Sequence, residues 1–325
     1  MKRYRLMGMV LALLLIASAC TSDDTTTTAA GATTTAAGAS TTVTLVQGSD
    51  LTFHMVTHSD DGVFWSVVKK GSEDAAAALG VTMVWNPSVN DPEKQVQDIE
   101  AAIAAGSNGL GVSLASPEAV APAVQKATDA GIPVVTLNSG VNQYKGLGAL
   151  THVGQTEIVA GEGAGERFSA LGATKVLCAR QEQSNIGLEE RCTGLANTFG
   201  GEVVSEFIGL DVNPDEQEAT IAALLQADTD IDAVLGTGPN VAVRAIAAGQ
   251  AAGREIIIGA IEAGEIAFTV DQQQYVQGYL PIVLLWLFNT NLNTVGGGLP
   301  VLTGPGFVDT NNVGQVKTLV EAGTR

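Results

Sequence analysis

The chain has 325 residues, and its 34 acidic residues outnumber its 16 lysines and arginines, which gives a formal net charge of −18 at pH 7. This charge argues against a nucleic-acid-binding protein, because such proteins draw most of their affinity from lysine and arginine contacts to phosphate. The part after the first 45 residues is long enough for two lobes of ordinary domain size.

The N-terminus has the features of a secretory signal. Basic residues within the first five positions precede an apolar run at 10–16, and small residues at 17–19 precede Cys20. This order resembles the cleavage box of bacterial lipoproteins, so we expect residues 1–19 to be a lipoprotein signal peptide and Cys20 to carry a lipid. The alternative is an ordinary signal peptide that is cut nearby.

Residues 20–48 consist mostly of threonine, alanine, serine and glycine. Such a segment has no hydrophobic period and cannot bury a core, so we expect a disordered tether. A tether behind a lipid anchor would hold the rest of the chain near a membrane.

The remainder of the chain contains an internal repeat with a constant offset of 122 residues. Residues 91–95 (DPEKQ) match 213–217 (NPDEQ), and the pairs at 116–117 and 130–131 match those at 238–239 and 252–253. Each copy has the pattern helix, strand, helix, strand. Two copies of an α/β pattern predict two similar lobes, with a cleft between them as the natural ligand site.

Strands alternate with helices along the whole body, which predicts parallel sheets with both faces covered. The fold class is therefore α/β, with two similar doubly wound parallel-sheet lobes and an interlobe cleft. Helices are expected at 64–79, after Pro92 and after Pro117, where proline opens a helix, and at 280–288 as a buried helix. Strands are expected at 51–56, 81–85, 110–114, 133–137, 176–178, 203–207, 233–235, 256–261 and 268–270.

Two cysteines remain if Cys20 is lipidated. Cys178 ends an apolar strand, and Cys192 lies in the helical segment that follows it. A strand and its following helix are neighbours, so we expect a disulfide between them in an oxidising compartment. Two free buried thiols are the alternative.

Parallel sheets bind ligands at the carboxyl ends of their strands. The residues there are mostly amides, carboxylates and hydroxyls, with one aromatic pair and one arginine, which suits a sugar that needs paired donors and acceptors and an apolar platform. The alternative is that such loops are polar anyway and that these side chains only cap helices. The candidates are Asp60, Asp61, Phe64, Trp65, Ser113, Asn138, Ser139, Gln183, Asn185, Arg191, Asn240, Glu262, Asp271 and Gln272.

Motifs for catalysis are absent from the sequence, which has no nucleophile elbow, no phosphate-binding loop and no pair of zinc-binding histidines on a helix. The glycine-rich stretch at 161–165 lies in a helical pattern, so close helix packing explains it. We expect neither an enzyme nor a cofactor or metal.

Three segments carry a resemblance to a known family, namely 57–71, 130–138 and 271–275. They resemble the ribose/galactose-type (type I) periplasmic binding proteins, which are the substrate-binding subunits of sugar ABC importers. The resemblance implies that the chain crosses between the lobes three times. It implies an N-terminal lobe of residues 49–154 plus 274–302 and a C-terminal lobe of residues 155–273 plus 303–325.

The resemblance also implies roles for single residues. Phe64 and Trp65 match the stacking aromatics, Arg191 the cleft arginine and Gln272 the hinge-side glutamine. The departures argue against plain ribose and for another sugar or a polyol. They are Ser113 and Gly238 where the ribose binders carry asparagine, Asn138 and Ser139 in place of an Asp-Arg pair, and Glu262 near the usual aspartate.

The sequence therefore predicts a monomeric, extracytoplasmic receptor, anchored to the membrane by lipid, that binds a sugar or polyol and delivers it to an ABC permease. The alternative is an anchored sensor that binds an autoinducer-type ligand and signals to a membrane partner.

Overall fold

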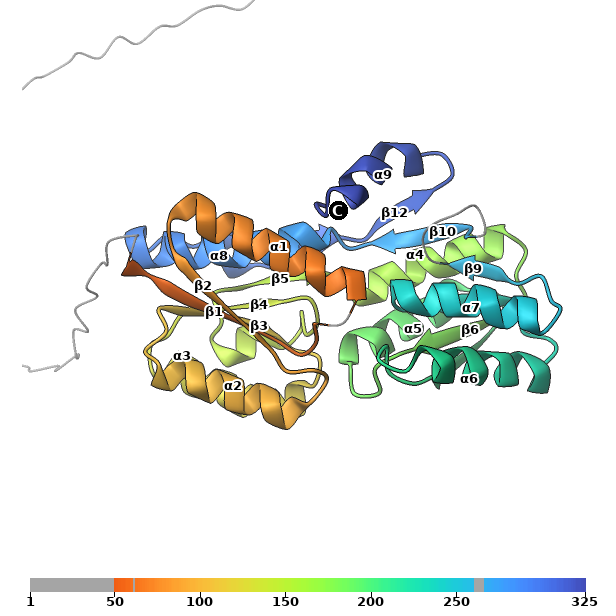
Figure 1. The fold of residues 1–325 in the computed structure, drawn as a ribbon, viewed down its shortest axis with the longest axis horizontal. Helices are drawn as coiled ribbons and strands as arrows, with labels where there is room; N and C mark the ends of the chain where they lie inside the picture. Colours follow the sequence, from red (N-terminus) through yellow and green to blue (C-terminus); the bar gives the residue numbers. More distant parts are fainter. Residues whose placement is uncertain (1–49, 61, 260–265) are drawn as a thin grey trace, which may run out of the picture. The chain divides into compact units, whose positions relative to one another are not determined.

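Six parallel strands form the first sheet of the computed structural model, which describes residues 50–60, 62–259 and 266–325 (Figure 1). Their spatial order is β11-β5-β4-β3-β1-β2. Five of these strands come from the first half of the chain, and β11 returns to the sheet from near the C-terminus. The strands are β1 (Thr52–Thr57), β2 (Thr82–Pro87), β3 (Gly109–Ser113), β4 (Val134–Leu137), β5 (Thr151–Gln155) and β11 (Val301–Gly304).

The second sheet has the order β12-β10-β9-β8-β6-β7. Its pairings are parallel except that β12 runs antiparallel to β10. The strands are β6 (Lys175–Arg180), β7 (Glu202–Phe207), β8 (Ala233–Gly236), β9 (Ile257–Gly259), β10 (Phe268–Asp271) and β12 (Gly306–Asp309).

Helices cover both faces of the first sheet. Residues of α1 (Gly62–Leu79) and α8 (Gln274–Asn291) share one core cluster with Phe53 and Met55. Residues of α2 (Pro92–Ala104) and α3 (Pro117–Asp129) share a second cluster with Leu110 and Val112. Alternate residues of a strand point to opposite faces, and β1 and β3 are accordingly buried on both faces.

The second sheet is covered in the same way. Helices α6 (Pro214–Ala227) and α7 (Pro239–Ala251) form a core with Leu177 and Val234. On the other face, α4 (Glu157–Ala170) and α5 (Ile186–Thr198) form a core with Val176 and Phe268. Short 3-10 turns lie at Tyr144–Leu147 and Gly296–Gly298, and α9 (Val313–Glu321) follows β12 near the C-terminus.

The predicted fold class is confirmed, and the repeat accounts for matching helices in the two sheets. The four proline-opened helices begin at Pro92, Pro117, Pro214 and Pro239. Gly131 and Gly253 follow the corresponding helix ends with positive φ, as helix C-termini favour. Residues 280–288 lie inside α8, and among the described helices there is none with the length and apolar character needed to cross a membrane.

Three strands were not predicted, namely β5, β11 and β12. The β5 sequence, THVGQ, contains more polar residues and glycine than apolar residues, although all five are buried. Strands β11 and β12 are separated only by Pro305, with Gly304 ending one strand and Gly306 beginning the other. Glycine and proline together are typical of a turn, so the sequence did not indicate strands here.

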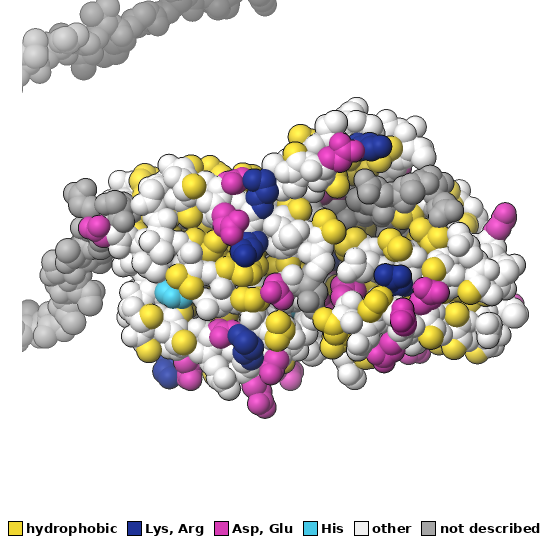
Figure 2. Space-filling view, viewed as in Figure 1, with side chains coloured by type: hydrophobic (Ala, Val, Ile, Leu, Met, Phe, Trp, Pro, Cys, Tyr) yellow, Lys and Arg dark blue, Asp and Glu magenta, His cyan; other side chains and the backbone are white. Residues whose placement is uncertain are grey.

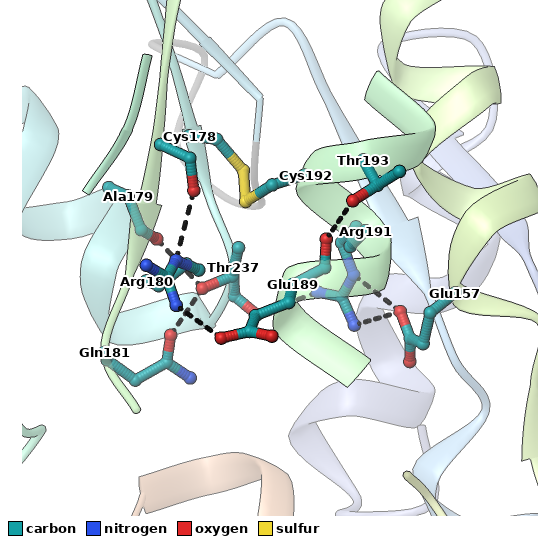
Figure 3. The surroundings of a disulfide bond; sticks show 11 residues. Glu157, Cys178, Ala179, Arg180, Gln181, Glu189, Arg191, Cys192, Thr193 and Thr237 are labelled. Atoms are coloured by element: carbon teal, nitrogen blue, oxygen red, sulfur yellow. Dashed lines mark hydrogen bonds and ion pairs between the residues drawn. A yellow bond between two sulfur atoms is a disulfide. The ribbon is translucent and has the colours of Figure 1, made fainter. Parts of the chain in front are cut away.

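The predicted disulfide is present between Cys178 on β6 and Cys192 on α5 (Figure 3). The two Cα atoms are 5.8 Å apart. The bridge therefore closes a loop that contains the whole β6–α5 connection.

Lysine and arginine side chains lie singly on the face of the molecule seen in Figure 2, each close to acidic side chains. Ion pairs of this kind include Lys70 with Asp74 and Lys94 with Asp98. This face therefore offers no contiguous basic patch for a polyanion.

Two pairs of helices approach each other through glycine. A Cβ atom on Gly278 of α8 would lie 1.8 Å from the carbonyl oxygen of Val68 on α1, and one on Gly71 would lie 2.2 Å from the oxygen of Tyr275. In the second sheet, Cβ atoms on Gly161 of α4 and Gly194 of α5 would each lie 2.0 Å from a carbonyl oxygen of the facing helix. The glycine-rich stretch predicted to pack closely does so.

This contact predicts the effect of adding one methyl group. Gly278→Ala should lower the free energy of unfolding by about 1–3 kcal/mol, because α1 and α8 must move apart to accept the methyl. Gly314→Ala is the control, since that α9 glycine has nothing within 4 Å of its added Cβ and gains helix propensity. Denaturant unfolding of both variants measures the difference, and equal stabilities would contradict the proposed role of the contact.

Candidate functional site

The carboxyl ends of strands from both sheets border one cavity of about 110 Å³. The first sheet contributes residues after β1 and β4, and the second contributes residues after β6, β8 and β10. The crossing from β5 into α4 contributes Glu157. A ligand in this cavity would therefore touch both lobes and two of the segments that join them.

An aromatic pair at the start of α1 lines the cavity. Trp65 is buried, and its ring meets the Phe64 ring edge to face at 5.2 Å between centroids. The His58 imidazole stands perpendicular to Trp65 at 4.9 Å. These contacts fix the indole, which can then offer a rigid apolar surface to a ligand.

Arg191 reaches the cavity from α5 and is held by an ion pair (Figure 3). Its Nε atom donates to the Glu157 Oε2 atom over 2.7 Å, and Nη2 forms an ion pair with the same oxygen at 2.7 Å. Its Nη1 atom donates to the carbonyl oxygen of Thr237 over 2.8 Å. Glu157 Oε2 also accepts from Gln155 Nε2 over 2.9 Å. These three contacts occupy at most three of the five guanidinium N–H groups, so two can serve a ligand.

A histidine and a glutamate meet across the cavity from the two lobes. The His58 Nε2 atom lies 3.2 Å from Glu182 Oε2, which also accepts from Asn185 Nδ2 over 2.6 Å. Burial would raise the pKa of Glu182, but the charge and hydrogen bonds of His58, Asn185 and Arg191 outweigh it and lower that pKa below its usual range. The Glu182 carboxylate is therefore ionised at neutral pH.

The Ser113 side chain holds His58 through two contacts. The Ser113 Oγ atom accepts from the backbone N–H of His58 over 2.8 Å, and lies 2.8 Å from His58 Nδ1. The one hydroxyl therefore contacts both the backbone and the ring of His58. Ser113 thus orients a residue of the cavity wall.

Amide side chains form the part of the site nearest the crossings. Asn138, with a φ of +64°, donates from Nδ2 to Gln277 Oε1 over 3.3 Å. Gln277 Nε2 donates to the carbonyl oxygen of Gln272 over 3.1 Å and to Thr303 Oγ1 over 3.1 Å. The fully buried Gln277 therefore links cavity residues from different segments of the chain.

The structure brings together nine of the predicted site residues as lining of this cavity. They are Phe64, Trp65, Asn138, Ser139, Asn185, Arg191, Gly238, Asn240 and Gln272.

The other predicted site residues lie elsewhere. Gln183 borders a neighbouring cavity of about 300 Å³, and Asp60 is exposed after β1. The buried Asp271 carboxylate accepts from the backbone of Gln273 over 3.0 Å and from Arg325 Nε over 2.9 Å. The Asp271 carboxylate therefore stabilises the backbone at the start of α8. Asp61, Glu262 and Cys20 lie outside the described residues.

Several lining residues were not among those predicted. Glu157 follows β5, and because the sequence does not predict that strand, it does not mark Glu157 as a residue at a strand end. His58, Gln181, Glu182 and Thr237 do follow predicted strands, but as polar loop residues they could not be told from helix caps. The described residues contain no group of three histidine, cysteine, aspartate or glutamate side chains able to hold a metal.

Comparison with known proteins identifies relatives of the whole body. A family described as "periplasmic binding protein domain" matches residues 52–288. A carbohydrate transporter from Acidothermus cellulolyticus, solved in complex with myo-inositol, is 39% identical with a TM-score of 0.81, covering 85% of this chain and 100% of that one.

Two curated relatives are more distant. A xylose/arabinose-binding protein of Sulfolobus acidocaldarius is 25% identical over 286 residues, covering 79% of this chain and 71% of that protein. A ribose import binding protein of Haemophilus influenzae is 26% identical over 246 residues, covering 71% and 83%.

His152 lies on β5, just before the crossing into the second lobe, and is fully buried. Its Nδ1 atom is 2.9 Å from Thr136 Oγ1. Burial lowers the pKa of the imidazole to about 3, and a hydrogen bond with the backbone of Asn138 offsets only part of this effect. The ring is therefore neutral in the folded protein at any ordinary pH.

This burial predicts a pH dependence of stability. Below about pH 6.5 the unfolded chain binds a proton at His152, whereas the folded protein binds that proton only below about pH 3. The free energy of unfolding therefore falls by up to about 1.4 kcal/mol for each pH unit of acidification between these two values. Between pH 7 and pH 5 the wild type should lose about 2 kcal/mol more than His152→Gln. Thr136→Val is the control, because it keeps the imidazole and hence the slope. Denaturant unfolding at both pH values tests this, and parallel losses in wild type and His152→Gln would refute it.

Proposed function

The chain belongs to the periplasmic binding protein family, and on that basis we propose that it is an extracytoplasmic receptor that binds a neutral sugar or cyclic polyol between two lobes and delivers it to an ABC permease. The lobes would be residues 49–154 plus 274–302 and residues 155–273 plus 303–325.

The observation that carries the proposal is the composition of the interlobe cavity. It combines a fixed aromatic pair, Phe64 and Trp65, with the two available N–H groups of Arg191 and with amides from both lobes. A saturated ring with several hydroxyls needs such a set, namely an apolar surface for its C–H face and paired donors and acceptors for its edge.

The charges of the cavity favour an uncharged ligand. Arg191 is already matched by Glu157 at 2.7 Å, so its positive charge is not free for an anionic ligand. Glu182 is ionised and accepts hydrogen bonds, as hydroxyl groups can provide. The solved relative that contains myo-inositol supports placing cyclic polyols first among the candidates.

Trp65 provides the sharpest test of the binding site. Trp65→Ala should weaken binding by about 2–4 kcal/mol, because the ligand loses its apolar platform. Trp85→Ala on β2 is the control, since Trp85 packs against the same core but does not line the cavity. Titration calorimetry should be run well below both melting temperatures, against pentoses, hexoses and myo-inositol.

The outcomes distinguish a ligand-binding role of Trp65 from a purely structural one. If both tryptophan variants lose affinity equally, Trp65 belongs to the scaffold and the stacking role is wrong. If the wild type binds none of these compounds, the sugar or polyol ligand itself is wrong. A small signalling molecule bound in the same cavity would instead support the anchored sensor.

The anchor is proposed from the sequence around Cys20, which lies outside the described residues. In the native host, wild-type protein should sediment with the membrane, and Cys20→Ala should appear in the soluble extracytoplasmic fraction, because a lipid chain no longer holds it. Ser22→Ala is the control that leaves the lipidated residue in place. Equal distribution of wild type and Cys20→Ala would exclude the lipid anchor.

A further inference from the structure

One short segment carries much of the second lobe's share of the cavity. Residues 178–192, here called the bridged segment, run from the end of β6 through the first turns of α5. The disulfide between Cys178 and Cys192 joins its two ends. Five cavity-lining residues lie inside it, namely Gln181, Glu182, Asn185, Leu188 and Arg191.

The same segment makes direct contacts with the first lobe beside the cavity. Asn185 Oδ1 accepts from Ser139 Oγ over 3.0 Å, and the backbone N–H of Ile186 donates to the carbonyl oxygen of Ala115 over 2.9 Å. The Ser116 and Ser184 hydroxyls lie 2.8 Å apart.

Two further side-chain contacts join the bridged segment to the first lobe. Glu182 pairs with His58, and Glu190 Oε1 accepts from Asn142 Nδ2 over 3.0 Å. The bridged segment thus both lines the cavity and touches the opposite lobe.

Local secondary structure alone holds this segment weakly. Residues 181–185 lie between β6 and α5, and α5 begins only at Ile186. The Asn185 side chain caps α5 by accepting from the backbone of Gly187 over 2.9 Å, but this oxygen is shared with Ser139. One amide oxygen therefore serves both the start of α5 and the contact with the first lobe.

The disulfide adds a covalent attachment next to the arginine. Cys192 directly follows Arg191, and both cysteines are buried in the core shared by α4, α5 and the second sheet. The bridge fixes α5 against β6, and Glu157 then meets Arg191 from α4 (Figure 3). A cross-link over a short loop restricts its backbone, and prior ordering of a binding segment improves affinity.

We propose that the Cys178–Cys192 bridge is a determinant of ligand affinity, because it positions Arg191, Asn185 and Glu182 before the ligand arrives. Neither cysteine lines the cavity, so both act through the residues between them. The inference rests on the proposed function, since it assumes a ligand in the interlobe cavity.

The test compares the double variant Cys178→Ala/Cys192→Ala with the wild type. With myo-inositol, or whichever sugar of the panel binds the wild type most tightly, the double variant should bind about tenfold more weakly. The matched control is Leu225→Ala, which empties part of the core on the opposite face of the same sheet. It should lower the melting temperature and leave the affinity within twofold of the wild type.

Hydrogen exchange of the ligand-free proteins provides a second measurement that needs no ligand. Amides of residues 181–191 should exchange faster in the double cysteine variant than in the wild type, while those of the first sheet stay unchanged. In Leu225→Ala the faster exchange should appear in α6 and not in the bridged segment.

The outcomes are distinct. Wild-type affinity in the double cysteine variant overturns the inference while leaving the proposed function intact. An equal affinity loss in Leu225→Ala also overturns it, because the effect would then follow from stability alone. If the wild type binds no sugar or polyol, the proposed function and the affinity effect both fail. Unchanged exchange in residues 181–191 shows that the bridge does not order the segment.

Discussion

The structure depends on the three places where the chain passes from one sheet to the other. These are β5 to α4, β10 to α8 and β11 to β12. Each sheet is completed by strands from distant parts of the sequence, so each crossing must be placed correctly before either lobe is whole. Polar side chains hold the crossings together, because backbone that leaves a sheet must find other hydrogen-bond partners.

The amide of Gln277 shows how the crossings are joined. It accepts from Asn138 at the end of β4, and it donates to Gln272 after β10 and to Thr303 on β11. A single buried side chain therefore ties together residues more than a hundred positions apart. Two of those partners, Asn138 and Gln272, also line the cavity, so the site and the crossings share one hydrogen-bond network.

The buried pair of Arg191 and Glu157 follows from the same arrangement. Glu157 begins α4 immediately after the first crossing, and Arg191 lies on the neighbouring helix α5. A buried ion pair contributes little net stability, whereas the loss of one partner leaves a costly unpaired charge. Its benefit here is geometric, because it fixes a planar group that still has two N–H donors to offer.

The sequence predicted the parts of the fold that depend on local pattern. Proline at the first helical position, glycine at the helix ends and apolar strands located most elements. Trp65 and Arg191 were noticeable as a tryptophan beside an exposed loop and an arginine facing the predicted cleft. Strand β5 was not predicted because its buried residues are mostly polar and make contacts distant in sequence, such as the hydrogen bond between His152 and Thr136. The contact between Asp271 and Arg325 could not be predicted for a related reason, since the two residues are 54 positions apart and no local pattern reveals the pair.

The glycine contacts between helices explain why the cavity walls hold their positions. Helix α1 carries Phe64 and Trp65 and packs through Gly71 on α8, whose first turns carry Gln274 and Gln277. Helix α5 carries Arg191 and packs through Gly194 on α4, which begins with Glu157. In each lobe, two helices in backbone contact bring their site residues to the same edge of the sheet. Because close-packed backbones leave little room for sliding, an error of position in one helix would displace the binding groups of both.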